Sequence, residues 1–436
     1  MENLSDKPKA IVLLAHQGLS YLPDISEACT KCGLRVLVVS SWPQPMSTIR
    51  EQSELYEAIS IVDEHNLAYD NVEPIVRSFS VDFYLVGAIS TFEGYRLIMA
   101  QVNQLLGVVD CSSTSLKNAL DKSEMRKILR QNGLSKVDSW ILSQDQFDLL
   151  KTSGASVFIK PRSGVGSFGC FRMDAKTTWA VMEGLSTQLN NDDFLKAAYL
   201  GNYDFIAEEY IPGIEFSFEI VACDKEYYTL AVHEKANLEA RDNTILENVD
   251  VSPSLTLETK QLLDGSGFVA RCLQALELYE GAFHVEARFD ENVKRWEIIE
   301  VNPRIGGGFI NHSVKEITEG ISILDAWLAV LIRQSTVPWI SLDHFKKLQN
   351  NFSQPKNATI GHYVFGEPSK TLRSIELKEG IPEPKILNTI AKVGDTLPEL
   401  SREIQVIEGM WSTPISELRN LLDVVNSGWV EVVYES

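Results

Sequence analysis

Three oxygen-bearing side chains interrupt two apolar segments that otherwise have the character of strands. Glu286 lies within FHVEARF, and Glu300 and Asn302 lie within WEIIEVNPR. Residues two apart in a strand point to the same face, so Glu300 and Asn302 share one face of an apolar strand. A buried carboxylate without a partner is costly, and this face therefore requires a compensating positive charge.

A divalent metal ion is one candidate for that charge. If the two segments pair as a hairpin, the oxygens of Glu286, Glu300 and Asn302 converge, and hard oxygen ligands suit Mg²⁺ or Mn²⁺. Magnesium often shares its coordination sphere with phosphate oxygens, so the site implies a nucleotide. Ion pairs of Glu300 with Arg304, or of Glu286 with Arg288, are the alternative explanation.

A glycine-rich loop follows a short apolar strand in VFIKPRSGVGSFG. Glycines let backbone amides approach a ligand closely and form a concave anion site. Lys160 ends the strand directly before Pro161, where a lysine has little structural use unless it meets an anion. The loop lacks GK[ST] and is therefore not a P-loop, and a flexible hairpin is the alternative. Its small residues are Ser163, Gly164, Gly166, Ser167 and Gly169.

The segment EEYIPGIE joins two apolar runs through turn residues. An apolar strand that runs into such a hinge offers backbone N–H and C=O groups to the edge of an adenine. Glu215, just past the turn, is placed to accept hydrogen bonds from ribose hydroxyls. Taken alone, the segment is more typical of a surface turn.

The elements that must position these residues change character along the chain. Alternating buried strands and helices indicate a parallel α/β sheet over about residues 1–115. The first strand is followed by HQGLSY in place of G-x-G-x-x-G, which disfavours NAD. The predicted elements there are strands at 9–15, 34–41, 58–63 and 81–88, and a helix at 93–107.

From residue 112 onward, the pattern mixes helices with antiparallel strands. Residues 112–134 are predicted as a capped helical region that ends at Gly133. After a break at Pro338, the rest of the chain is predicted as short strands and turns. The other predicted elements are a strand–loop–strand at 157–173, a strand–turn–strand at 205–224, strands at 227–236, 281–290 and 295–304, and a helix at 265–278.

The composition limits the classes of function. The net charge of −20, from 40 Lys and Arg against 60 Asp and Glu in 436 residues, argues against nucleic-acid binding. The first apolar run is shorter than a spanning helix and no small-residue cleavage site follows it, so we expect a cytoplasmic protein without a membrane partner. Six irregularly spaced cysteines suit reduced thiols, and CTKC at 29–32 is interpreted as incidental.

The order of these motifs resembles that of the ATP-grasp superfamily. DKSEMRKIL…NGL, VFIKPRSGVGSFG, EEYIPGIEFSFE, HVEARF and IIEVNPRIGGG occur in the family's order over about residues 1–335. The resemblance implies an ATP-grasp fold that combines α/β and α+β architecture. The domains it implies are an N-terminal parallel α/β domain at 1–115, an ATP-grasp domain at 116–335 with lobes at about 125–210 and 211–335, and a C-terminal subdomain at 336–436.

The resemblance also implies roles for individual residues, with ATP and Mg²⁺ (or Mn²⁺) as cofactors. Lys160 and Arg304 are the expected catalytic residues, and Arg304 would stabilise the transferred phosphoryl group and the tetrahedral intermediate. Residues 162–169 would close over the phosphates, and the metal ligands would be the three oxygen-bearing residues named first. The expected ATP contacts are Lys122, Lys160, Ser163, Gly166, Ser167, Glu208, Glu215 and the backbone of Glu209 and Ile211.

Within the superfamily, the chain looks similar to the L-amino-acid ligase and dapdiamide-synthase group. The similarity lies in residues 231–254 and in the region after 336. It implies that His233 and Lys235 face an acyl substrate, and the polar side of a sheet strand explains these two residues equally well. Specificity is expected in the pocket walls around them.

The glycine run IGGG follows the expected catalytic Arg304 directly. Gly307 and Gly308 would let a substrate backbone come close to that arginine. His312 lies shortly after the run and is not expected to be functional. Biotin carboxylases share the E-x-N-x-R-I run, but the Q-V-E-H that follows it in those enzymes is missing here.

The function that the resemblance implies is an ATP-dependent carboxylate–amine ligase. Such an enzyme forms an amide or dipeptide bond through an acylphosphate and releases ADP and phosphate. An ATP-grasp ligase that uses bicarbonate or a carrier thiol, and a nucleotide-binding protein without turnover, are the alternatives. The expected partners are small amino acids or carboxylates and amines, and related enzymes are often homodimers.

Overall fold

The computed structural model describes residues 7–435 except 18, 20, 43, 44, 242, 337, 400 and 401. Residues 1–6 of the predicted N-terminal domain, and Gly18 and Ser20 of HQGLSY, lie outside the described residues. No helix among those described is long and apolar enough to cross a membrane.

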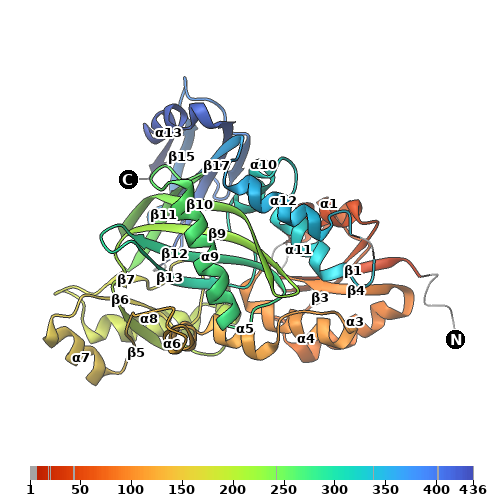
Figure 1. Ribbon diagram of the computed structural model, residues 1–436, viewed down its shortest axis with the longest axis horizontal. Helices are drawn as coiled ribbons and strands as arrows, with labels where there is room; N and C mark the ends of the chain where they lie inside the picture. Colours follow the sequence, from red (N-terminus) through yellow and green to blue (C-terminus); the bar gives the residue numbers. More distant parts are fainter. Residues whose placement is uncertain are drawn as a thin grey trace.

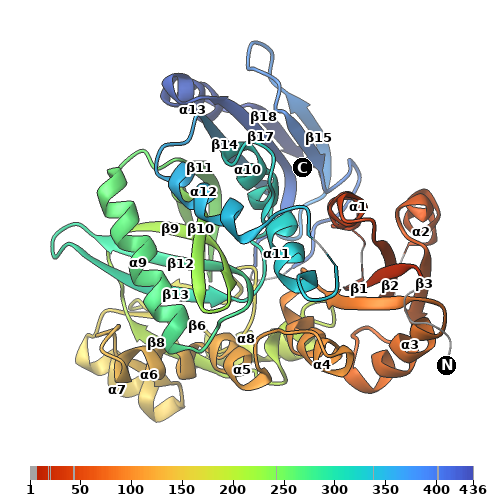
Figure 2. The same ribbon diagram turned by 45° about the vertical axis from the view of Figure 1, so that its right-hand side comes forward.

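The N-terminal part is a four-stranded parallel sheet in the order β3-β2-β1-β4, which confirms the predicted α/β architecture (Figure 1). Helices α1 and α11 cover one face, and α3 and α4 cover the other (Figure 2). The predicted strand at 81–88 begins only at Tyr84, because Val81 and Asp82 still belong to α3. The elements are β1 (Lys9–Ala15), α1 (Leu22–Lys31), β2 (Arg35–Ser41), α2 (Met46–Glu51), η2 (Ser53–Leu55), β3 (Ala58–Val62), α3 (Tyr69–Asp82), β4 (Tyr84–Ile89), η3 (Glu93–Tyr95), α4 (Arg96–Leu106) and, from later in the chain, α11 (Ile323–Ile332).

A smaller antiparallel sheet follows, in the order β5-β8-β6-β7. The predicted helical region at 112–134 contains two helices, because the Asp121 carboxylate accepts hydrogen bonds from the backbone N–H groups of Ser123 and Glu124 and starts a new helix. The elements are α5 (Ser113–Leu120), α6 (Lys122–Gln131), β5 (Ser139–Ile141), α7 (Gln144–Ser153), β6 (Val157–Pro161), β7 (Phe171–Arg172), α8 (Trp179–Asn191), η4 (Lys196–Tyr199) and β8 (Phe205–Glu209).

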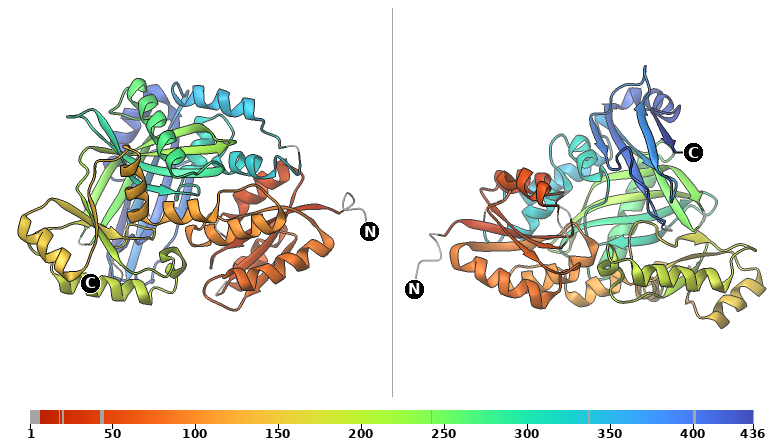
Figure 3. Two further views of the ribbon diagram at one scale, coloured as in Figure 1. Left: turned by 60° about the horizontal axis from the view of Figure 1, so that its bottom comes forward. Right: turned by 180° about the vertical axis from the view of Figure 1, so that it is seen from behind.

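The largest sheet has eight antiparallel strands in the order β13-β12-β9-β10-β11-β14-β17-β16 and forms the centre of the molecule in both views of Figure 3. The predicted hairpin of residues 281–290 and 295–304 is confirmed as β12 and β13. The elements are β9 (Ile214–Cys223), β10 (Glu226–Arg241), β11 (Thr244–Ser252), α9 (Thr259–Ala275), β12 (Gly281–Asp290), β13 (Arg295–Asn302), α10 (Ile310–Ile317), β14 (Asn357–Phe365), β16 (Ile386–Thr389) and β17 (Gln405–Pro414).

The last hundred or so residues continue the large sheet, because β14 pairs with β11. The sheet therefore runs across the predicted boundary at 336, and the division into domains stays a prediction. The expectation of strands and turns alone is wrong, since two helices occur there; α13 buries Leu418, Leu422 and Val425 along one side. The remaining elements are α12 (Leu342–Phe352), β15 (Leu372–Leu377), η5 (Ile415–Glu417), α13 (Leu418–Asn426) and β18 (Val430–Tyr434), of which β15 and β18 form a separate ladder.

A β-bulge in β13 decides which face its acidic residue occupies. Glu286 pairs with Glu300, but the next residue of β12, Ala287, pairs with Ile298, so Ile299 is an extra residue. Strict alternation would put Glu300 on the same face as Ile298, inside the apolar core. The bulge turns Glu300 to the opposite face, next to Asn302, while Ile298 stays fully buried.

Helix α9 covers the apolar face of this sheet and requires a glycine to do so. A Cβ atom on Gly265 would lie 2.7 Å from the Trp296 ring and 2.8 Å from the Phe218 ring. Gly267, in the same helix, is exposed, and a Cβ there would have only the Arg271 guanidinium within 4 Å, at 3.8 Å. The space for a methyl group is therefore absent at Gly265 and present at Gly267 of the same helix.

We predict opposite effects of alanine at these two glycines. Gly265→Ala should lower the free energy of unfolding by about 1–3 kcal/mol through overpacking, although alanine is the better helix former. Gly267→Ala, the matched control, should raise it by up to about 1 kcal/mol. Urea unfolding followed by circular dichroism measures both. Equal stability of the two variants would contradict this account of the packing.

Candidate active site

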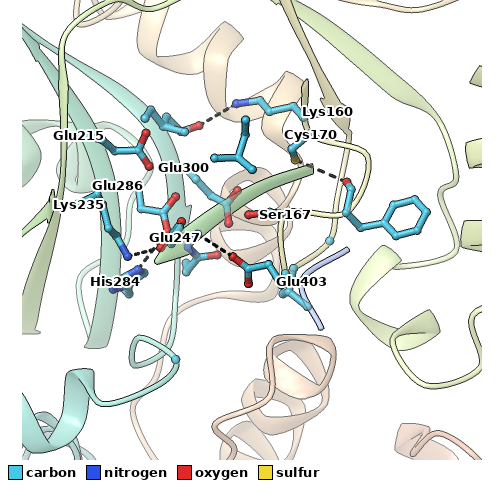
Figure 4. A pocket seen from close by; sticks show the side chains of 18 of the residues that line it. Lys160, Ser167, Cys170, Glu215, Lys235, Glu247, His284, Glu286, Glu300 and Glu403 are labelled. Carbon is cyan, nitrogen blue, oxygen red and sulfur yellow. Dashed lines mark hydrogen bonds and ion pairs between the residues drawn. The ribbon is translucent and has the colours of Figure 1, made fainter. Parts of the chain in front are cut away.

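A cleft between the small antiparallel sheet and the polar face of the large sheet gathers most of the predicted site residues (Figure 4). Its described lining does not include the predicted Ser163 or His233, both of which are buried. The predicted residues that line the cleft are Lys122, Lys160, Gly166, Ser167, Glu208, Glu209, Ile211, Glu215, Lys235, Glu286, Glu300, Asn302, Arg304, Gly307 and Gly308.

The backbone register explains why the polar side chains meet. In the β12–β13 ladder, Glu286 lies opposite Glu300, and His284 lies opposite Asn302. On the other side of β12, Glu219 of β9 lies opposite His284. Side chains directly opposite one another share a face at roughly 5 Å. A polar row therefore crosses three adjacent strands, and the three predicted metal ligands share its face.

The arginines of the alternative ion pairs have other partners. Arg304 lies 3.1 Å from Glu93, which comes from the N-terminal part of the chain, and Arg288 lies 2.9 Å from Glu215. Glu300 instead has Lys122 Nζ at 3.1 Å. The compensating charge that the sequence demands is thus supplied, at least in part, by a lysine from the start of α6.

Glu93 is a buried carboxylate that reaches the cleft's edge from η3. Burial raises its pKa to about 7; Arg304 acts in the opposite direction, and the negative charge of Glu300 raises the pKa further. A carboxyl group whose pKa is raised this far is typical of functional sites.

Lys160 belongs to a buried charge network at the end of β6. Its Nζ lies 2.7 Å from Glu208 and donates to the carbonyl of Ile299, the bulge residue, at 2.9 Å. Arg126 holds the same Glu208 at 2.9 Å and also Glu297 at 2.8 Å. Burial would raise the pKa of Glu208, but the charges of Arg126 and Lys160 prevail and lower it to about 2. These contacts fix the position of the Lys160 ammonium group in the cleft.

The hinge after β8 is held by an arginine. Arg288 donates to the carbonyl of Ile211 at 2.7 Å and binds Glu215, and its guanidinium lies 5.4 Å from the centre of the Tyr210 ring. The backbone N–H of Glu209 donates to Asp138 at 3.0 Å. The hinge backbone is therefore anchored to β12 and to the segment before β5, beside the cleft.

The cleft also holds a cluster of carboxylates, two of which, Glu247 and Glu403, were not predicted from the sequence. Oxygens of Glu215, Glu247 and Glu286 lie within 4.8 Å of one another, and Lys235 forms an ion pair with Glu247 (Figure 4). Glu403, from the segment before β17, accepts from the backbone N–H of Glu247 at 3.3 Å. Burial and the charge of Glu247 raise the pKa of Glu403 to about 8.

His284 links two of the buried acids. Its Nδ1 lies 2.8 Å from Glu219 and its Nε2 lies 3.2 Å from Glu286. Carboxylate oxygens only accept, so both ring nitrogens carry protons and the ring is cationic. Burial lowers the pKa of His284, but Glu219 and Glu286 outweigh this effect and raise it to about 9. His284 thereby holds Glu286 in place.

The other two histidines named from the sequence lie away from the cleft. His233 is fully buried, and its Nε2 lies 2.7 Å from the Ser313 hydroxyl; its assignment to a substrate stays a prediction. His312 lies 3.2 Å from Asp24 of α1, and it joins the N-terminal part to α10.

The donor set suits a metal–nucleotide pair. Glu286 and Glu300 keep 16% and 20% of their side chains exposed, so their oxygens are accessible from the cleft. Carboxylate and amide oxygens are the ligands that Mg²⁺ prefers. The lining carries more carboxylates than basic groups, so a polyanionic nucleotide would need accompanying cations. Lys122, Lys160 and the glycine-rich loop supply the groups that phosphates bind.

Comparison with known proteins identifies the class. Residues 153–312 match the ATP-grasp domain family, so the chain contains an ATP-grasp domain. The match includes the glycine-rich loop, the hinge, β12, β13 and the glycine run. Among curated protein sequences, none matches the chain significantly.

Solved structures extend the likeness to nearly the whole chain. An L-amino acid ligase from Bacillus licheniformis has a TM-score of 0.77 at 20% identity, covering 99% of this chain and 100% of that one. Phosphoribosylglycinamide synthetase from Anaerococcus prevotii has a TM-score of 0.66 at 15% identity, covering 98% and 100%. Biotin carboxylase from Campylobacter jejuni has 0.67 at 13% identity, covering 97% and 92%. These likenesses confirm the ATP-grasp fold.

Sequence analysis missed several residues of the cleft. His284 had a usable signal, because it lies two residues before Glu286 and so shares its face. Glu93 and Glu403 had none, since only tertiary structure brings η3 and the segment before β17 to the same cleft. The missed lining or supporting residues are Glu93, Arg126, Glu219, Glu247, Asp250, His284, Tyr363 and Glu403.

The buried network predicts a pH-dependent contribution to stability. A fall of the Glu208 pKa from its usual 4.5 to about 2 corresponds to roughly 3 kcal/mol. Because the folded pKa is the lower one, this contribution is present above pH 4.5 and is lost as the pH falls towards 2. Glu208→Gln should therefore be several kcal/mol less stable than wild type at pH 7.

The difference between the two proteins should shrink on acidification. Urea unfolding at pH 7, 5, 4 and 3 measures it. Glu209→Gln is the matched control, because Glu209 is its exposed neighbour, and it should follow wild type closely. A stability gap for Glu208→Gln that stays constant from pH 7 to 3 would contradict the assignment.

Proposed function

We propose that the protein is an ATP-dependent carboxylate–amine ligase that joins an amino acid or related carboxylate to an amine. The observation that carries the proposal is that Glu286, Glu300 and Asn302 line one cleft together with Lys160 and Arg304. The likeness to an L-amino acid ligase over both full chains supports this class of substrates. ATP and Mg²⁺ are the proposed cofactors.

In the first step, an oxygen of the substrate carboxylate attacks the γ-phosphorus of ATP. A new O–P bond forms as the bond between the γ-phosphorus and the ADP oxygen breaks. Lys122 and Lys160 hold the phosphate oxygens, and backbone amides of the glycine-rich loop add donors above them. A divalent ion held by Glu286, Glu300 and Asn302 would neutralise charge on the phosphates.

In the second step, an unprotonated amine attacks the acyl carbon. The C–N bond forms, the C–O bond to phosphate breaks, and the proton that the nitrogen loses passes to the departing phosphate. Arg304 lies beside the glycine run, where it stabilises the tetrahedral oxyanion. Gly307 has no atom within 4 Å of its would-be Cβ, so a substrate can lie against this backbone.

The two alternative functions predict different co-substrates. A carboxylase-like ligase would release phosphate with bicarbonate alone, and a nucleotide-binding protein would release none. Phosphate release from ATP and Mg²⁺ across pairs of L-amino acids and small carboxylates, with mass spectrometry of products, separates the three. We expect release only with certain pairs, together with a condensed product that is lighter than its parts by one water.

Glu300→Gln should abolish turnover while the protein still folds. The amide keeps the shape but loses the charge that a metal requires, and we expect a loss in kcat of about 10²–10³-fold. Glu291→Gln, in the exposed turn of the same hairpin, should match wild type. Normal phosphate release by Glu300→Gln would remove this residue from the metal site.

Lys160→Ala should weaken ATP binding by roughly 10–100-fold, since a hydrogen bond to a charged group contributes about 1.5–3 kcal/mol. Isothermal titration with a non-hydrolysable ATP analogue and Mg²⁺ measures the affinity. Lys176→Ala, an exposed lysine beyond the glycine-rich loop, serves as the control. Unchanged affinity in the folded Lys160→Ala variant would contradict its contact with phosphate.

A further inference from the structure

A second cavity, which we call the N-terminal pocket, lies beside the carboxyl end of the N-terminal sheet. It has a volume of about 270 Å³. Val165, Arg304 and Gly307 line both this pocket and the active-site cleft, so the two spaces adjoin at the glycine run. A molecule in the N-terminal pocket can therefore present one end to the reacting atoms.

The walls of the N-terminal pocket are mostly apolar. Leu13 and Leu14 come from the end of β1, and Leu19 and Leu22 come from the loop and the start of α1. Phe92 and Phe194 complete the apolar lining. These walls favour a hydrocarbon or aromatic group and penalise a charged one, because a charge there would lose its hydration without gaining a partner.

Apart from His16 and Tyr21, the only titratable side chains in the described lining are Glu93 and Arg304, which pair with each other at the end next to the cleft. Arg304 binds oxygen Oε2 of Glu93, and a carboxylate has a second oxygen that can accept from an ammonium group. The pocket thus combines a long apolar wall with a single charged end. An amphiphilic ligand with a short charged head matches that distribution.

His16 lines the same pocket and is neutral. Its Nε2 contacts the carbonyl of Phe194, which only accepts, so Nε2 carries the proton. Nδ1 then accepts from the Tyr95 hydroxyl at 2.9 Å, and the ring stacks on Phe92 with centroids 4.0 Å apart. Burial lowers the pKa of His16 to about 4, in agreement with a neutral ring. His16 therefore acts as an aromatic wall without charge.

We propose that the N-terminal pocket selects an amine substrate with an uncharged, apolar side chain, and that Glu93 binds its amino group. The proposal rests on the proposed ligase function and adds the class of its second substrate. The side chain would lie against Leu19, Phe92 and His16, and the nitrogen would lie at the junction with the cleft, beside Arg304 and Gly307.

The test measures KM and kcat for the amine substrate with the full-length protein, ATP, Mg²⁺ and whichever carboxylate supports phosphate release. The probes are L-leucine, L-phenylalanine, L-lysine and L-glutamate as amines. Wild type should show a KM at least about tenfold lower for the two apolar probes. Leu19→Ala should raise the KM for L-leucine about tenfold with a smaller change in kcat. Leu149→Ala, an exposed leucine of α7, is the matched control.

Leu19 is buried, so Leu19→Ala could fail to fold. A second variant therefore tests the same pocket at an exposed residue. Phe194→Ala removes a ring that is 48% exposed, so the fold should persist. It should also raise the KM for apolar amines and leave the KM for ATP unchanged. Glu93→Gln should raise the KM for every amine probe, since an amide has one accepting oxygen where the carboxylate has two, one for Arg304 and one for the amino group.

The outcomes separate this proposal from the proposed function. Phosphate release that favours L-lysine or L-glutamate, or apolar preferences that neither Leu19→Ala nor Phe194→Ala changes, would overturn the pocket assignment while the ligase remains. Absence of release with every pair of substrates would instead overturn the ligase, and the pocket proposal would fall with it. Preference for apolar amines, weakened in both variants, supports the proposal.

Discussion

The position of the cleft carboxylate Glu300 depends on one extra residue, Ile299, in strand β13. Without the bulge at Ile299, Glu300 would point into the same core as Ile298 and Trp296, where its charge would have no partner. With the bulge, the strand keeps its apolar residues against α9 and turns Glu300 towards the cleft. The carbonyl of Ile299 then accepts from Lys160, so the irregularity also anchors the lysine of the facing sheet.

Charge balance explains why three parts of the chain must meet at the cleft. Glu300 of the large sheet pairs with Lys122 of α6, and Arg304 pairs with Glu93 of the N-terminal part. Lys160 of the small sheet pairs with Glu208 of the same sheet and donates to the carbonyl of Ile299 in the large sheet. Each buried charge in these pairs would be costly alone. The segment before β17 adds Glu403, so the extended sheet also reaches the site. The cleft lining carries more carboxylates than basic side chains. The metal ions that accompany ATP would supply the positive charge that this excess requires.

Much of the site was predictable because it is encoded locally. Glu286, Glu300 and Asn302 are recognisable from alternation, and Lys160 from its place between an apolar strand and glycines. The bulge was not predictable, since WEIIEVN has no glycine or proline to mark it. Glu93 and Glu403 depend on contacts between segments far apart in the chain. Helix α13 was missed because its short apolar stripe, Leu418, Leu422 and Val425, follows a run of strand-like segments.

The central claim is that a substrate carboxylate is activated by phosphorylation at this cleft. It is tested most directly by supplying the carboxylate substrate with ¹⁸O in its carboxyl group and analysing the released phosphate by mass spectrometry. The account predicts that one ¹⁸O atom passes to each phosphate, because the carboxylate oxygen that attacks the γ-phosphorus leaves with it. Phosphate without label, released while product forms, would contradict an acylphosphate intermediate.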